Sequence, residues 1–323
     1  RDLIVTGVQT CALPISTHRK TVYEPVEQEI IGVTEANITG ADNFITLSKK
    51  GQITVWTQGE KNTLKEELSF TLPAAKRVLT VSAAPVKDKK AQIFVSYFDE
   101  KRQTISTAVL ENQNGALKEI ATLSYFAKEL GCGKNKQIWL QKPFVSGAYP
   151  GNARLIAYTD GKFAPAKETL STYRNWLTGL NRYAVESADV QNIIYTSSNG
   201  PLRLVTASGK RAESKDLFAA APNRVKYKQE ILKFYPSVQV FGPEGRATLA
   251  AVENISKLGI LSDTFGQYKS SKIHFLAFEK GRLSVTDTVE LDGVVYDTAC
   301  TDKAILSAEV LPDGNSSVVE IFK

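Results

Sequence analysis

The chain has 323 residues, of which 42% are hydrophobic and 23% charged, a composition that is typical of a globular protein and excludes a disordered one. No stretch approaches the roughly 20 apolar residues that a membrane-spanning helix needs. The formal charge of +6 could favour an anionic partner. Acidic residues lie between many of the basic ones, however. We therefore expect lysines and arginines such as Arg224 and Lys226 to lie on solvent-exposed edges of strands. Nucleic acid is not expected as a partner, because aromatic and basic residues are not interleaved on a common strand face.

Residues 1–15 read as a foreign segment. The stretch from Val5 to Ile15 can be encoded by codons that spell a common short-read sequencing adapter, and Arg1 and Asp2 fit the adapter bases that precede an index. The chain also contains no Met, which fits a gene interrupted at its 5′ side. We therefore expect residues 1–15 to be artefactual and residues 16–323 to form a single domain. The alternative is a genuine first β-strand in this segment.

From residue 30 onward, a group of β-prone segments recurs about every 50 residues, a period within the range of propeller repeats. The first copy is the clearest: its apolar or alternating segments span residues 30–34, 44–47, 52–56 and 66–72, and the turn before the third contains Gly51. Five weaker copies follow, with their first recognisable strands at residues 78–83, 137–140, 183–187, 237–241 and 294–299. The repeat predicts an all-β fold, a β-propeller of about six four-stranded blades with a seventh possible. Two stacked β-sandwiches are the alternative.

The last copy offers only three strands, at residues 294–299, 304–310 and 317–322. A ring of sheets with one strand missing leaves unpaired edges, which folded proteins avoid. The segment at residues 21–30 stands before the first full copy and is β-prone. We therefore expect the ring to be closed by an N-terminal strand from this segment.

Two segments interrupt the regular pattern. Residues 220–235 include a helix-compatible run with apolar Val225, Ile231, Leu232 and Phe234, and residues 254–271 form a long insertion between two strands. Long loops in a compact repeat often carry function. From these segments and from the loop around residue 175 we select the candidate partner-contact residues, which are Tyr173, Trp176, Lys257, Phe265 and Tyr268. Trp176 could be a stacking platform for a sugar or a base; packing within a blade is the simpler interpretation.

No reactive constellation stands out. His18 and His274 are the only histidines, so neither a metal cluster nor a Ser-His-Asp arrangement is predicted, and we assign no catalytic, cofactor-binding or metal-binding residue. Outside the foreign segment, the cysteines are Cys132 and Cys300, far apart in sequence and too few for a disulfide framework. We expect two buried thiols.

The leading strand, polar loop and apolar strand of each copy resemble FG-GAP repeats, also called VCBS repeats, which build integrin-alpha-like β-propellers. Residues 250–259, 268–271 and 274–281 resemble a blade found in bacterial extracytoplasmic proteins of this type. The resemblance implies a bacterial protein of the periplasm or another extracytoplasmic compartment. In the family, an Asp-rich loop after the first strand binds calcium, but the first copy has Glu35, Asn37, Gly40 and Asp42 there and the second a run of lysines. Since calcium needs several carboxylate ligands, we expect these turns to be held by protein hydrogen bonds alone, without a cofactor.

Together these features predict a non-catalytic propeller scaffold that binds a protein or polysaccharide partner in the bacterial cell envelope. The alternative is an enzyme of the propeller class, a glycosidase or lyase, that uses carboxylates at the central channel.

Overall fold

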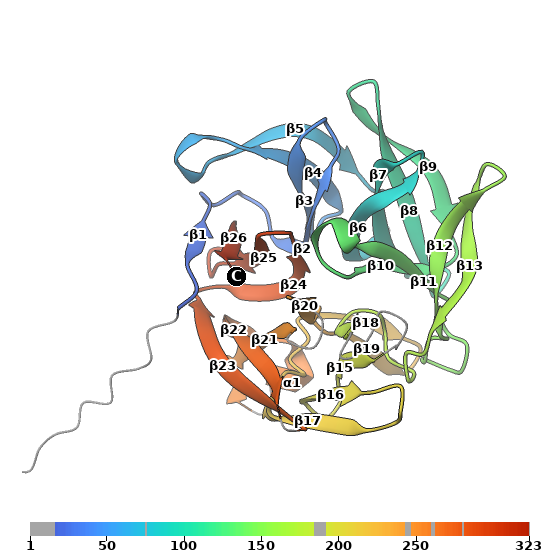
Figure 1. The fold of residues 1–323 in the computed structure, drawn as a ribbon. Helices are drawn as coiled ribbons and strands as arrows, with labels where there is room; N and C mark the ends of the chain where they lie inside the picture. Colours follow the sequence, from blue (N-terminus) through green and yellow to red (C-terminus); the bar gives the residue numbers. More distant parts are fainter. Residues whose placement is uncertain are drawn as a thin grey trace, which may run out of the picture.

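The computed structural model describes residues 17–74, 76–183, 192–242, 247–259, 262–279 and 281–322. The expected foreign segment at residues 1–15 lies outside these ranges. Within them the strands form six four-stranded antiparallel blades that follow one another in chain order around a ring (Figure 1). The fold is therefore an all-β β-propeller, as predicted, and the alternative of two stacked sandwiches is wrong. Two neighbouring blades, the fourth and fifth, also join at their outer strands through a single parallel pair, Ser214 with Leu283.

Each blade runs from an inner strand at the ring axis to an outer strand at the rim. The first blade contains β2 (Ile30–Asn37), β3 (Asp42–Ser48), β4 (Gln52–Gln58) and β5 (Leu64–Thr71). The second contains β6 (Lys76–Lys87), β7 (Lys90–Asp99), β8 (Thr104–Gln113) and β9 (Ala116–Leu123), and the third β10 (Phe126–Leu130), β11 (Gln137–Gln141), β12 (Ala153–Thr159) and β13 (Lys162–Leu170).

The second half of the ring is built in the same way. The fourth blade contains β14 (Leu180–Arg182), β15 (Ile193–Thr196), β16 (Pro201–Val205) and β17 (Arg211–Leu217). The fifth contains β20 (Gln239–Phe241), β21 (Thr248–Ser256), β22 (Tyr268–Glu279) and β23 (Arg282–Leu291). The sixth contains β24 (Val294–Cys300), β25 (Ala304–Val310), β26 (Ser316–Phe322) and β1 (Lys20–Val22). Short helices lie in three connections: η1 (Glu60–Asn62), η2 (Gly133–Asn135) and α1 (Ser262–Phe265).

Burial along the strands explains why this sequence builds blades. The inner and second strands pack against neighbouring blades on both faces, so β7 is buried at seven consecutive positions. The outer strand of the same blade, β9, has exposed residues between buried Leu117 and Leu123. One side of this strand therefore faces solvent. The apolar core thus lies between the blades.

The ring is closed by the N-terminal strand. In the sixth blade β1 pairs antiparallel with β26, with Thr21 opposite Glu320, and the Tyr23 hydroxyl donates a hydrogen bond of 2.7 Å to the Glu320 carboxylate. The Lys20 ammonium also reaches the Glu290 carbonyl oxygen in the fifth blade, at 3.0 Å. The expected closing strand is confirmed: β1 pairs with β26 over residues 20–22, and Val26 forms a further antiparallel bridge to Ser316 at the start of β26.

The segment that was expected to be helix-compatible is instead a β-hairpin. β18 (Asn223–Tyr227) pairs with β19 (Glu230–Phe234), and together they leave the ring between the fourth and fifth blades. Val225, Tyr227, Leu232 and Phe234 are buried in a cluster with residues of the second, third and fourth blades. Their spacing of two along each strand places them on one face of the hairpin, and burial of that face overrides any helical tendency.

The two cysteines were expected to be thiols, and this expectation is wrong. Cys132, just after β10, and Cys300, at the end of β24, form a disulfide with a Cα–Cα distance of 4.7 Å. β10 and β24 belong to the third and sixth blades, which are opposite each other in the ring. The cysteines are 168 residues apart in sequence and become neighbours only because the ring closes.

The expected hydrogen-bonded turns are present in the first two blades. In the first, the Asn43 side-chain oxygen accepts hydrogen bonds from the backbone of Ile38 and Thr39 at 3.2 and 3.1 Å. In the second, the Gln92 side-chain oxygen does the same for Val86 and Lys87. A search of the described residues finds no helix that is both long and apolar enough to cross a membrane.

Candidate functional site

The ring axis is filled with polar side chains rather than left open. Lys128 of β10 and Asp297 of β24 are 1% and 4% exposed, and the Lys128 ammonium lies 2.6 Å from the Asp297 carboxylate. The hydroxyl of Thr80, from β6, donates to the same carboxylate oxygen at 3.0 Å, and the backbone N–H of Ser237 donates to the other. Inner strands of the second, third and sixth blades, and the segment entering the fifth, therefore meet in one hydrogen-bonded network.

A second buried carboxylate, Glu129, lies at the next position of β10. It accepts hydrogen bonds from the Thr34 hydroxyl and the Ala83 backbone N–H, and the Lys136 ammonium is 3.8 Å away. Glu129 and Asp297 are thus each paired with a lysine and enclosed. The enzyme alternative expected carboxylates at the channel, and these two are already held in ion pairs.

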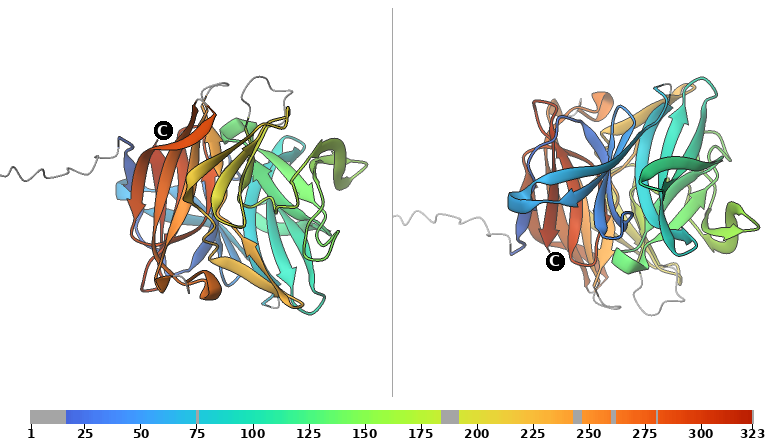
Figure 2. Two further views of the ribbon diagram at one scale, coloured as in Figure 1. Left: turned by 90° about the horizontal axis from the view of Figure 1, so that it is seen from below. Right: turned by 90° about the horizontal axis from the view of Figure 1, so that it is seen from above.

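At one end of the ring, which we call the hairpin face, the two irregular segments lie together. The side views show the amber β18–β19 hairpin and the orange helix α1 on the same side of the ring, opposite the green turn η2 (Figure 2). The Arg224 guanidinium of β18 donates a hydrogen bond of 3.1 Å to the Tyr268 hydroxyl at the start of β22. Gly266, with φ of +69°, lies so close that an added Cβ would be 2.8 Å from the Arg224 side chain. The sequence offered these segments as separate candidates, and the structure brings them into contact.

Between these segments and the start of the first two blades lies a groove of about 580 Å³, the hairpin-face groove. Its lining includes four basic residues and no acidic one, together with two exposed apolar side chains. These six residues are Lys49, Arg77, Arg224, Lys226, Ile231 and Phe265. Ile231 and Phe265 are 55% and 62% exposed, so they place apolar surface beside the basic side chains of the groove.

Two groups in the groove have shifted pKa values. Burial raises the pKa of the Tyr296 hydroxyl and the Glu29 carboxylate adds to this rise, while the charges of Lys49 and Arg77 act in the opposite direction. A hydrogen bond to Glu29, with the ammonium and carboxylate 2.5 Å apart, raises the pKa of Lys49. Both groups therefore keep their ordinary neutral-pH forms, a neutral phenol and a charged ammonium, and the groove remains cationic.

The five candidate contact residues are placed differently. Phe265 lines the hairpin-face groove, and Tyr268 and the exposed Lys257 belong to the same insertion. Tyr173, in the connection from β13 to β14, is 46% exposed and stacks on Tyr195 at 6.2 Å between ring centroids.

Trp176 packs in an aromatic cluster. It is 9% exposed, with the ring centroids of Phe126 and Phe234 at 5.6 and 5.4 Å. This position matches the packing interpretation and leaves little of the indole surface for stacking with a sugar or a base.

Sequence reasoning missed the basic residues of the groove because they come from different repeat copies. Lys49 ends the first hairpin of the first blade, Arg77 begins the second blade, and Arg224 and Lys226 lie on β18. The available signal was the alternation of Arg224 and Lys226 with buried Val225 and Tyr227, which marks a strand with one charged face.

No family model and no curated protein matches the sequence. Among solved structures, a putative oxidoreductase (glucose dehydrogenase) from Thermus thermophilus is similar with a TM-score of 0.51 and 10% identity, over 94% of this chain and 100% of that one. The WD40 β-propeller domain of Doa1 gives a TM-score of 0.43 and 12% identity, over 94% and 97% of the two chains. At this identity the likeness to the Thermus protein concerns the fold alone, and that fold is the β-propeller.

Proposed function

We propose that the protein is a non-catalytic β-propeller that binds an acidic protein partner through the hairpin-face groove. The observation that carries the proposal is the gathering of Lys49, Arg77, Arg224 and Lys226 beside exposed Phe265 and Ile231. Aromatic and arginine side chains are enriched where protein partners dock. Glu29 pairs with Lys49 at the edge of the groove, while Arg77, Arg224 and Lys226 leave the groove with a net positive charge, which attracts a partner of the opposite sign.

A protein fits this groove better than a polysaccharide. The exposed side chains beside the charges are an isoleucine and a phenylalanine, and the apolar side chains of a peptide can bury both.

The enzyme alternative has less support. The two carboxylates on the ring axis, Glu129 and Asp297, are enclosed and held near lysines, whereas general acid or base chemistry needs a carboxyl that can reach the substrate.

An oxidising, extracytoplasmic compartment of a bacterium is part of the proposal. It is supported by the Cys132–Cys300 disulfide, since such bonds persist mainly in oxidising environments.

The test uses a fluorescein-labelled peptide of alternating Glu and Phe residues, with a Lys-Phe peptide of equal length as the reference and alginate as an anionic polysaccharide. We expect the Glu-Phe peptide alone to bind in fluorescence anisotropy. The double variant Arg77→Glu/Lys226→Glu should weaken this binding about tenfold or more. Phe265→Ser should weaken it by a smaller factor, because the variant removes apolar contact and leaves the charge unchanged.

The matched control is Lys118→Glu/Lys162→Glu, which makes the same change of charge at exposed positions of β9 and β13. If the control weakens binding as much as the groove variant, the attraction is a property of net charge and the proposal fails. Binding of alginate in preference to the peptide would instead favour a polysaccharide partner.

A further inference from the structure

A second groove lies at the opposite end of the ring, which we call the disulfide face. It has a volume of about 680 Å³, within the range of pockets for small ligands. The first, second, third and sixth blades all contribute to its lining, and its charged residues are Glu35, Asp42, Lys89, Lys90, Glu111, Lys134, Lys136 and Asp302. The groove is independent of the hairpin-face site.

Its acids and its exposed lysines come mainly from different blades. The acids Glu35 and Asp42 come from the first blade and Asp302 from the neighbouring sixth blade. Lys89 and Lys90 lie at the turn of the second blade. The two lysines of the third blade lie beside the acids: the Lys134 backbone N–H donates a hydrogen bond of 3.2 Å to Asp302, and the Lys136 ammonium donates to the Glu35 backbone carbonyl oxygen. Glu111, the one acid on the lysine side, is 3.5 Å from the Lys87 ammonium and accepts a hydrogen bond from Gln92.

Glu35 is the most constrained of these acids. Burial raises the pKa of its carboxyl, and the nearby carboxylates of Asp42 and Asp302 raise it further, against the opposing effect of Lys136. Among the described residues no donor forms a hydrogen bond with this carboxyl. A partly desolvated carboxylate without a donor is unfavourable, and a cationic group of a ligand would compensate it.

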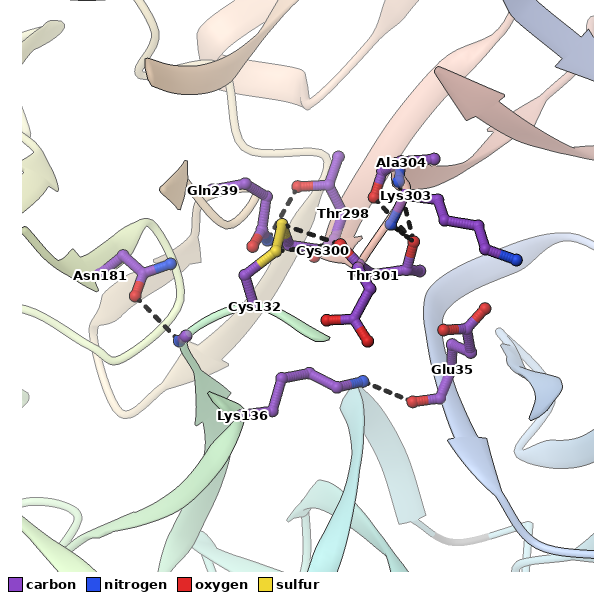
Figure 3. Close-up of a disulfide and its surroundings, with 12 residues drawn as sticks. Glu35, Cys132, Lys136, Asn181, Gln239, Thr298, Cys300, Thr301, Lys303 and Ala304 are labelled. Carbon is purple, nitrogen blue, oxygen red and sulfur yellow. Dashed lines mark hydrogen bonds between the residues drawn. A yellow bond between two sulfur atoms is a disulfide. The ribbon is translucent and has the colours of Figure 1, made fainter. Parts of the chain in front are cut away.

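Lys136 does not fill that role, because its ammonium is directed elsewhere. It donates to the Glu35 backbone carbonyl oxygen, which is the contact drawn in Figure 3, and to the Thr34 hydroxyl at 3.2 Å. On the other side of the groove, Lys89 and Lys90 are exposed and form no ion pair with a described carboxylate. Each pole of the groove therefore has charge available for a ligand.

We propose that the disulfide-face groove binds a small zwitterion, an amino acid or a short peptide. Its ammonium group lies against Glu35 and Asp42, and its carboxylate group lies against Lys89 and Lys90. The volume admits such a ligand whole, and the two poles fix its direction.

The experiment is isothermal titration calorimetry with glycine, diglycine, triglycine and tetraglycine, followed by the best binder in two capped forms. N-acetylation removes its ammonium group and C-terminal amidation removes its carboxylate. We expect one member of the series to bind, and each cap to weaken binding about tenfold. In Glu35→Gln the acetyl cap should lose its effect, and in Lys89→Gln/Lys90→Gln the amide cap should lose its effect.

The matched controls are Glu100→Gln and Lys101→Gln, which lie at an exposed turn of the second blade at the hairpin end of the ring. Thermal unfolding establishes that each variant is folded before its titration. The proposal is overturned if no glycine peptide binds the folded protein, if capping leaves affinity unchanged, or if the controls reduce binding as much as the groove variants do.

Discussion

At the scale of single residues, Glu35 makes stability depend on pH. Its folded-state pKa is raised above 4.5 by burial and by neighbouring carboxylates, so the folded state holds the proton more tightly than the unfolded state does. A raised pKa means that stability falls as pH rises through the folded-state value. Glu35→Gln removes the charge, and we expect it to raise the melting temperature at neutral pH relative to the parent.

This difference should shrink as the pH is lowered below the pKa of an ordinary glutamate, because the parent is then protonated in both states. Thermal unfolding of the parent and of Glu35→Gln, followed from about pH 4 to about pH 8, measures it. Glu100→Gln serves as the reference for loss of an exposed carboxylate. Parallel curves for the parent and Glu35→Gln would contradict the expectation.

At the scale of elements, strand β1 seals the ring by covering the edge of β26. Removing residues 1–22 should expose that edge and also remove the Lys20 contact to the fifth blade. We expect a lower melting temperature and concentration-dependent association, because an uncovered strand edge is a template for pairing with another chain. Removing residues 1–15 alone should change neither property. Size-exclusion chromatography over a range of concentrations and thermal unfolding provide the measurements.

The elements also differ in how well the sequence predicts them. The strands of the first blade are recognisable because alternating residues and a Gly-containing turn, at Gly51, mark their bounds. The β18–β19 hairpin carries no such signal: Lys228 takes the left-handed conformation at φ of +53°, where glycine or asparagine would be expected. The same residues are also compatible with a helix, and tertiary packing of the buried face selects the hairpin instead.

At the scale of the whole molecule, the disulfide ties opposite blades across the axis. Joining residues 168 positions apart restricts the unfolded chain strongly, and loss of such a bond typically costs about 2–5 kcal/mol. In a Cys11→Ser background, we expect Cys132→Ser/Cys300→Ser to lower the free energy of unfolding by about this amount. Denaturant titration of both proteins, with and without reducing agent, tests it. Reductant should destabilise the Cys11→Ser parent and leave the triple variant unaffected; equal responses would contradict the expectation.

Neither candidate site could be predicted as a site at this scale. The six-fold repeat gives the ring, but the residues that share a groove come from different copies, as Lys49, Arg77 and Phe265 do. The sequence shows that Glu35 and Asp42 depart from the calcium-loop pattern. It does not show that they share a groove with Lys89 and Lys90 of the next blade, because that depends on the angle between the blades. Contacts between residues of different blades form only when the ring closes, and the residue pattern within one repeat copy does not indicate them.

The closing strand has a consequence for the order of assembly. Tyr23 and Glu320, which meet in the sixth blade, are 297 positions apart, so the ring cannot close on the ribosome until β26 has been synthesised. Earlier blades can form their own hairpins while β1 remains without its partner, and the nascent chain carries open sheet edges throughout that interval. Closure then depends on the encounter of two segments that are distant in sequence, a kind of contact that slows folding in general.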